Sequence, residues 1–276
     1  GVLSDGVVAL NRLSAQLPGT SGVSVSGTLR PERGLAYADL TGRIDATDLR
    51  RLLDWSGVPV ADIPGDRLRR MTAEGRLTGT AREFRLTGVR VTLDGTRATG
   101  GLAYVDRGRP GFGLRLELDR INLDAYWPGG RVPVSDPEWI SRLRDLAGRF
   151  DANVEATAGS VTVGAAAIED LRLDGTLSGG ALTLRRAEIG HMAGASLGIT
   201  GSIASIEPLS GLDLTVDVRS PDGARLLETL VDESPLPAAR LGALKLHGRI
   251  QGGPERLTFR TSAELAGADI DLGGTV

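Results

Sequence analysis

The residue types best suited to chemistry lie at positions 194–198, where Gly-Ala-Ser-Leu-Gly matches the nucleophile elbow of a serine hydrolase. Ser196 would be the nucleophile, His247 the general base, and Asp213 or Asp217 the carboxylate that orients the base. Such an elbow requires a strand before the serine and a helix after it. Because the residues after Ser196 alternate in the manner of a strand, we expect no catalysis from this motif. We predict that the protein is not an enzyme.

Metal binding has little support in the sequence. His191 and His247 are the only histidines, and neither has a companion at the spacing of metal ligands. The chain contains no cysteine, which excludes disulfides, thiolate ligands and a cysteine nucleophile. The acidic residues in 119–124 and 267–273 alternate with apolar ones, so we expect them on a solvated face. The sequence therefore predicts neither a metal nor a cofactor.

The charge and hydropathy of the chain limit which partners it is expected to bind. Of 276 residues, 41% are hydrophobic and 24% charged, and the formal net charge of −3 argues against nucleic acid, which requires a clustered basic surface. Arg67, Arg69 and Arg70 form a small basic group that would suit lipid headgroups, although a solvated loop is the favoured interpretation. No run of about 18 apolar residues is present, so no segment of the sequence is expected to span a membrane.

The elements that must position any site are strands. Between Arg76 and Trp127 apolar and polar residues alternate, with breaks at Gly, Asp or Pro. Phe112, Leu114 and Leu116 lie two residues apart, so they share one face of an extended chain. The 39 glycines suit many short strands joined by tight turns. The sequence predicts a mainly β fold with a few short helices, built as a long curled antiparallel sheet with one apolar face.

Local signals predict the interruptions of this sheet. The parity of apolar positions changes at Gly88, which indicates a turn or bulge. Short helices are expected where apolar residues recur at helical spacing behind a capping residue, at 4–17, 47–56, 135–148 and 221–231. The expected caps of these helices are, in order, Ser4, Thr47, Ser135 with Glu138, and Ser220.

The chain contains an uneven internal repeat of several strands followed by a short helix. Residues 94–105, 193–206 and 266–276 each read as a turn, an alternating strand, a glycine and another strand. We expect three blocks: an N-terminal helix with a strand-helix repeat at 1–70, a central β-repeat with a closing helix at 71–150, and C-terminal β-repeats at 151–276. The blocks are expected to form one continuous groove within a longer protein.

These alternating runs resemble the AsmA-like family of the Gram-negative envelope, which includes TamB- and YhdP-type proteins. The resemblance is carried by residues 75–127 and 168–218, with a looser match in the first 70 residues through DLTGRIDATDLRRLLDW at 39–55. The resemblance implies a curled β-groove with an apolar concave face, anchored in the inner membrane by a helix outside this chain and projecting into the periplasm. No catalytic motif belongs to this family.

The implied function is non-enzymatic phospholipid transfer between the inner and outer membranes, with acyl chains shielded in the groove. One buried methylene contributes about 0.8 kcal/mol, so exposing an acyl chain to water costs on the order of 10 kcal/mol. Outer-membrane or other envelope proteins are the implied partners. The alternative is a closed β-sandwich or solenoid that serves as a scaffolding or adhesin-like module without a ligand.

The candidate lipid contacts are the alternating apolar residues of the strands. They are Leu86, Val91, Leu93, Leu102, Phe112, Leu114, Leu116, Leu118, Leu171, Leu173, Leu182, Leu184, Leu197, Ile199, Leu212, Leu214, Val216 and Val218.

Overall fold

The computed structural model describes residues 2–4, 6–130, 132, 141–142, 144–145, 147–164, 166–223, 242–265 and 267–276. The chain divides into two compact units, unit 1 (Gly1–Val132) and unit 2 (Pro133–Val276). Strands account for 71% of the protein and helices for 8%. The predicted mainly β fold with a curled antiparallel sheet is therefore confirmed.

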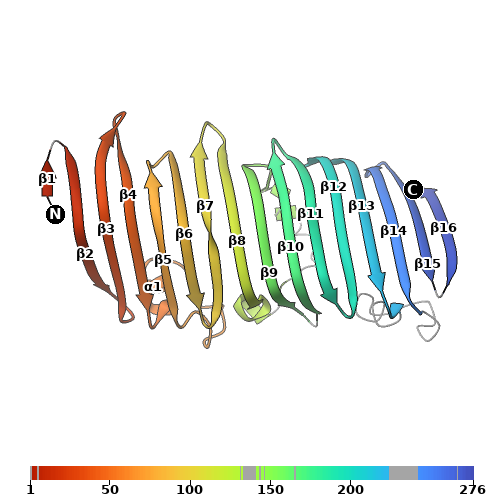
Figure 1. Ribbon diagram of the computed structural model, residues 1–276, viewed down its shortest axis with the longest axis horizontal. Coiled ribbons are helices and arrows are strands. Elements are labelled where there is room, and N and C mark those ends of the chain that lie inside the picture. The colour runs from red at the N-terminus through yellow and green to blue at the C-terminus, as the bar shows by residue number, and fades with distance from the viewer. Residues whose placement is uncertain are drawn as a thin grey trace. The chain divides into compact units, whose positions relative to one another are not determined.

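Unit 1 is an antiparallel sheet in which consecutive strands pair with one another (Figure 1). Its strands are β1 (Val2–Ser4), β2 (Val7–Leu17), β3 (Ser21–Glu32), β4 (Leu35–Ala46), β5 (Met71–Gly79), β6 (Glu83–Leu93), β7 (Thr96–Asp106) and β8 (Pro110–Asn122). Helix α1 (Leu49–Trp55) follows β4, and the short 3-10 helices η1 (Asp124–Tyr126) and η2 (Pro128–Gly130) follow β8.

Unit 2 repeats this organisation, again with each strand antiparallel to the next. Its strands are β9 (Asp151–Val163), β10 (Ala166–Ser178), β11 (Ala181–Met192), β12 (Ala195–Ile206), β13 (Leu209–Ser220), β14 (Leu244–Gly253), β15 (Arg256–Leu265) and β16 (Ala268–Thr275).

Tight turns explain why these strands form meanders. Between β6 and β7 the chain reverses at Asp94 (φ 48°) and Gly95 (φ 95°). Two successive residues with positive φ match the right-handed twist of flanking strands, and Asp-Gly is a preferred pair for this turn. Sequence neighbours therefore become spatial neighbours throughout each unit.

The predicted first helix is wrong, because residues 7–17 form β2. Val8 and Leu10 pair with β3, and a register shift follows before Leu13. The extra residue of this bulge changes the apolar spacing from two to three, which imitates one turn of a helix.

The predicted irregularity at Gly88 is confirmed: the register shifts between Leu86 and Val89, and Gly88 has a φ of 59°.

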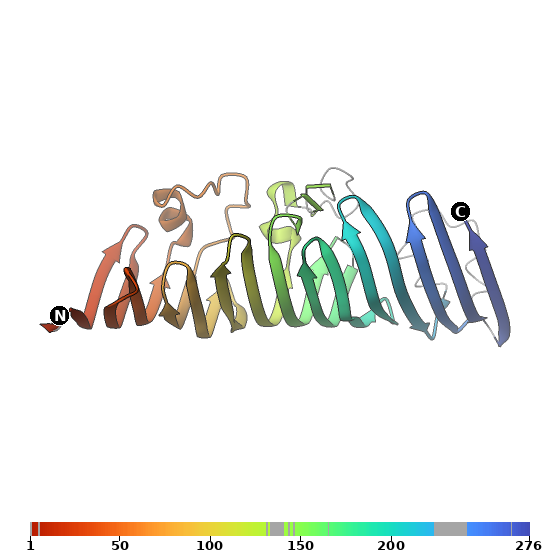
Figure 2. The same ribbon diagram turned by 90° about the horizontal axis from the view of Figure 1, so that it is seen from above.

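The predicted helix at 47–56 is confirmed as α1, but its cap is Asp48 rather than Thr47. The Asp48 carboxylate accepts a hydrogen bond from the amide of Arg51, whereas the Thr47 hydroxyl donates to Thr20 Oγ1 at 2.9 Å. Figure 2 shows α1 and the loop that follows it on one side of the unit 1 sheet.

Arg50 holds that loop together. Its guanidinium donates to four backbone carbonyls, those of Val60 (2.7 Å), Ile63 (3.0 Å), Pro64 (3.1 Å) and Arg67 (3.5 Å). We expect Arg50→Met to lower the free energy of local unfolding of this loop by about 2 kcal/mol, because hydrogen bonds to a charged group are stronger than those between neutral groups. Amide hydrogen exchange in residues 57–70 should accelerate at least tenfold in Arg50→Met and remain unchanged in the exposed control Arg51→Met. Equal exchange in the two variants would contradict this role.

The other expected helices fall largely outside the described residues. The predicted capping box of 135–148 lies there, as does most of the predicted helix at 221–231. Residues 141–142, 144–145 and 147 are helical, in agreement with the first of these predictions. Ser220 accepts a hydrogen bond from the Asp222 amide at 3.2 Å and donates to the Asp222 carbonyl at 2.8 Å.

Candidate functional site: the apolar sheet faces

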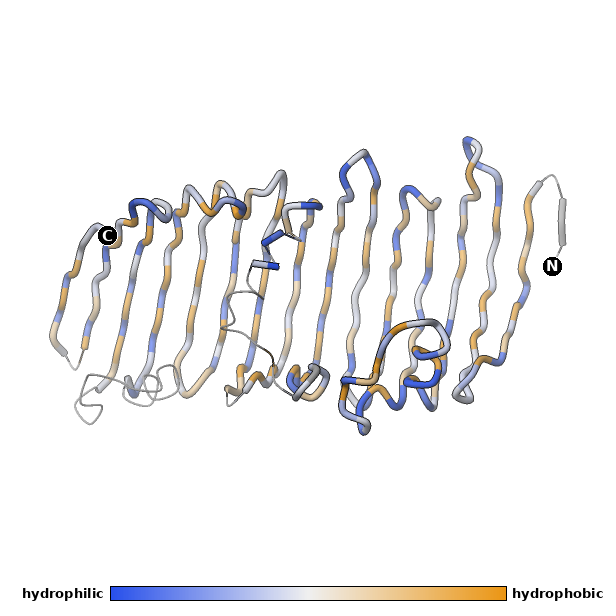
Figure 3. Tube along the Cα trace, turned by 180° about the vertical axis from the view of Figure 1, so that it is seen from behind, coloured by the Kyte–Doolittle hydropathy of each residue, from blue (hydrophilic) through white to orange (hydrophobic). Residues whose placement is uncertain are grey.

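Strand register collects the predicted residues of unit 1 on one face, which we call the unit 1 apolar face. Along one row Ala73 pairs with Val91, Val91 with Ala98, and Ala98 with Leu118. Because directly paired residues point to the same side of a sheet, the row is continuous across β5–β8. Figure 3 shows the hydropathy alternating along these strands.

Two further rows of the unit 1 apolar face lie beside this one. In the first, Leu86 pairs with Leu102, and Leu102 pairs with Leu114. In the second, the rings of Phe84, Tyr104 and Phe112 follow one another with centroids 5.2 and 5.4 Å apart. Tilted aromatic contacts at this distance are favourable. Leu93 and Leu116 occupy paired positions opposite Thr96 and Gly100.

The predicted residues of unit 2 likewise share one side, the unit 2 apolar face. Its rows are defined by direct pairing through β10–β13. The first is Leu171, Ile189, Leu197 and Val218, and the second is Leu173, Ala187, Ile199 and Val216. The third is Gly175, Leu184, Gly201 and Leu214, and the fourth is Leu177, Leu182, Ile203 and Leu212.

These faces are open rather than packed as a conventional core. None of the eighteen candidate residues is buried; Phe112 is 36% exposed and the others are half-buried. Within the described parts of unit 1, the buried apolar residues are Ala46, Leu49 and Val60, which belong to the α1 segment and the strand before it. That segment covers one end of the unit 1 apolar face and leaves most of the face accessible.

Both apolar faces extend beyond the residues predicted from the sequence. In unit 1, register adds Val25, Leu40 and Ile44 of β3 and β4. In unit 2 it adds Ile189 and Ile203 of β11 and β12, which pair with candidate residues. The signal that would have found all of them is the same period-two alternation, followed across each bulge.

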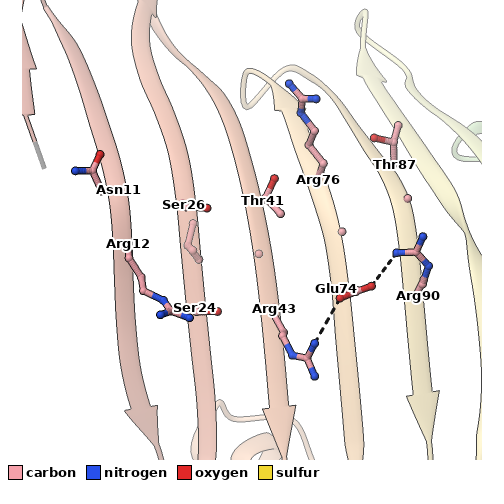
Figure 4. Close-up of a pocket in the computed structure, with 14 residues that line it drawn as sticks. Asn11, Arg12, Ser24, Ser26, Thr41, Arg43, Glu74, Arg76, Thr87 and Arg90 are labelled. Carbon is pink, nitrogen blue, oxygen red and sulfur yellow. Dashed lines mark hydrogen bonds and ion pairs between the residues drawn. The ribbon is translucent and has the colours of Figure 1, made fainter.

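The opposite, polar faces carry cross-strand ion pairs. Arg76 binds Asp39 through two hydrogen bonds of 2.7 Å, and Arg249 binds Asp213 through bonds of 2.9 and 2.8 Å. The hydrogen bonds from each arginine lower the pKa of the paired carboxyl group below its ordinary value. Figure 4 shows part of this polar surface in unit 1.

The depressed pKa of Asp213 gives a pH-dependent prediction. Its ionised form is favoured by folding, so its stabilising effect is present above the ordinary carboxyl value of 3.8 and is lost as pH falls through the lower, folded pKa. The melting temperature of the wild type should exceed that of Asp213→Asn at pH 7, and this difference should vanish toward pH 2. The exposed control Asp269→Asn should show little difference at either pH. A difference for Asp213→Asn that does not change with pH would contradict the assignment.

The elbow motif lacks the local structure that its chemistry needs. Ser196 is the second residue of β12, which continues as a strand to Ile206, so no helix follows the serine. His247 Nδ1 lies 2.8 Å from Asp217 Oδ1, but Ser196 pairs with Arg219 rather than with either residue. The structure brings the histidine and the aspartate together and leaves the serine outside their contact.

The remaining histidine and the three arginines singled out in the sequence each lie beside an aspartate. His191 Nδ1 lies 3.8 Å from Asp170 on the exposed surface. Arg67 pairs with Asp66 at 3.0 Å, whereas the amides of Arg69 and Arg70 donate to the Asp94 carboxylate. The described part of the chain holds no group of three side chains suited to a metal ion, and none of its helices is long and apolar enough to cross a membrane.

No protein-family model, no curated protein and no solved structure matches this chain.

Proposed function

We propose that this protein is a non-enzymatic phospholipid-binding segment whose apolar sheet faces shield acyl chains in the periplasm. The observation that carries the proposal is the accessibility of the two apolar faces. In each unit, rows of Leu, Val and Ile cross several strands on one side while remaining only half-buried. Exposed apolar surfaces of this extent mark binding sites for apolar partners.

The geometry suits an acyl chain that crosses the strands. Neighbouring strands lie about 4.8 Å apart, so the five strands β10–β14 extend the row through Leu171 and Val218 over roughly 19 Å. An acyl chain on such a row removes apolar area from water on both partners, at roughly 25 cal/mol per Å². The sequence resemblance to AsmA-like proteins supports the same function and the envelope location.

A scaffolding module without a ligand is the second candidate, and one observation favours it. Strand β16 pairs with β15 and carries Ile270 and Leu272 at 38% and 58% exposure. Exposed apolar side chains of this kind also suit a protein partner. In this alternative the sheet would serve assembly, and its apolar faces would bind protein.

Site-specific photo-crosslinking distinguishes the two candidates. A benzophenone side chain at position 116 or 214 would lie on an apolar face, and one at 117 or 215 on a polar face. After irradiation of cells that have a Gram-negative envelope, we expect phospholipid adducts at 116 and 214 and none at 117 and 215, as measured by mass spectrometry of the intact protein. Protein adducts without lipid at 116 and 214 would favour the scaffold.

A further inference from the structure

The polar face of unit 1 contains a hollow of about 590 Å³ that the proposed function does not use. Residues from five consecutive strands, β2–β6, line it, and Figure 4 shows their side chains. Its charged members are four arginines, Arg12, Arg43, Arg76 and Arg90, and one glutamate, Glu74. Arg76 is paired with Asp39, which does not line the hollow, and the other three arginines still outnumber Glu74. The lining therefore carries a surplus of positive charge in a protein whose net charge is −3.

Register arranges the polar side chains in two rows. In the first, Ser24 pairs with Arg43, Arg43 with Glu74, and Glu74 with Arg90. Arg12, at the bulge of β2, extends toward Ser24 (Figure 4). Since strands lie about 4.8 Å apart, Arg43 and Arg90 are roughly 10 Å from each other on either side of Glu74.

The second row is formed by hydroxyl groups and one more arginine. Ser26 pairs with Thr41, Thr41 with Arg76, and Arg76 with Thr87. The hydroxyls of Ser26, Thr41 and Thr87 make no hydrogen bond to any described residue, so their donors and acceptors are available to a ligand.

The arginines of the first row are incompletely neutralised. Glu74 serves both Arg90, at 2.8 Å, and Arg43, at 3.6 Å, and the longer distance exceeds that of a hydrogen bond. No described residue forms an ion pair with Arg12. On the polar face of unit 2, by contrast, Lys245 and Arg249 each have a carboxylate of their own, Glu264 and Asp213, at 2.8 Å. The hollow therefore retains guanidinium donors directed at open space.

We propose that this hollow binds a ligand that carries two or more phosphate groups. Guanidinium forks match the oxygens of phosphate and bind them through parallel, charge-assisted hydrogen bonds. No aromatic side chain lines the hollow, so a stacked nucleobase is not the expected part of the ligand. The site lies on the face opposite to the acyl-binding surface, so it does not rest on the proposed function.

Titration calorimetry with sodium tripolyphosphate at fixed ionic strength tests this site. We expect saturable binding by the wild type and at least tenfold weaker binding by Arg43→Gln/Arg90→Gln. The matched control, Lys245→Gln/Arg249→Gln, removes the same charge from the polar face of unit 2 and should bind within twofold of the wild type. Equal losses in the two double variants, or no saturable binding by the wild type, would overturn the proposal.

Glu74→Gln should change the affinity for tripolyphosphate in the opposite direction. Removing this carboxylate eliminates its repulsion of phosphate and releases Arg43 and Arg90, so the affinity for tripolyphosphate should rise about threefold to tenfold. If Glu74 and the arginines form only a structural ion-pair row, Glu74→Gln will lower the melting temperature without tightening binding, and the proposal fails.

Phosphate could come from a lipid headgroup or from a soluble compound. Sedimentation with cardiolipin vesicles distinguishes these sources, because each cardiolipin headgroup carries two phosphates, and phosphatidylcholine vesicles are the control. Loss of sedimentation in Arg43→Gln/Arg90→Gln would assign a headgroup. Tripolyphosphate binding without sedimentation would assign a soluble phosphate compound. Both results support the shared chemistry of the site.

Discussion

Replacing Leu116 and Leu214 with aspartate should reduce uptake of a fluorescent phospholipid from vesicles at least tenfold. Each residue lies within the rows of an apolar face, at a half-buried position. An ionised carboxylate loses its water when an acyl chain covers it, which costs several kcal/mol. Because both positions remain partly accessible to solvent in the folded protein, the variant should still fold.

The matched control for this variant is Thr92→Asp/Thr215→Asp. It adds the same charge to the polar faces, where Thr92 pairs with Arg97 and Thr215 with Arg249. We expect this control to take up phospholipid like the wild type. Similar uptake by the apolar-face variant and the control, with circular dichroism unchanged in both, would mean that the apolar faces do not contact lipid.

Gly201→Ala should lower the free energy of unfolding by about 2–4 kcal/mol. Gly201 lies within β12 with a φ of 130°, a conformation that L-residues rarely adopt. A Cβ atom here would lie within 2.1 Å of the Asp213 carbonyl oxygen and 2.9 Å of the Leu214 Cα. Both neighbours are backbone atoms of the paired strand, so the contact cannot be relieved by a side-chain rotation.

Gly198→Ala, in the same strand, provides the control for Gly201→Ala. Its Cβ would lie 3.9 Å from the nearest atom, the Cβ of Asp217, which is an ordinary van der Waals distance. Hydrogen exchange of β12 and β13 should accelerate strongly in Gly201→Ala and change little in Gly198→Ala. If the two variants exchange alike, the backbone at Gly201 has room that the structure does not show.

The strands and their apolar faces could be predicted from the sequence, because apolar and polar residues alternate along every strand of a sheet that has one apolar side. This prediction failed where a bulge changes the spacing of apolar residues. Leu10 and Leu13 of β2 are separated by such a bulge, and the resulting interval of three matches helical spacing. The same interval separates Leu86 from Val89, but there Gly88 marks the irregularity.

The polar hollow could not be predicted from the sequence, because it depends on the register between strands. Arg43, Glu74 and Arg90 are separated by 31 and 16 positions in the chain, and only strand register places them side by side. A shift of one residue in any of these strands would move its side chain to the other face. Register is set jointly by turns and bulges along the chain, so a local pattern could not reveal the row.

The central claim is that the apolar faces hold phospholipid, and native mass spectrometry tests it most directly. The wild-type protein should be purified in mild conditions from a host with a Gram-negative envelope, and the bound molecules extracted and identified. We predict folded protein that carries phospholipid, seen as mass increments that disappear on extraction. A folded monomer that is free of lipid would contradict the claim and would favour a sheet that serves only assembly.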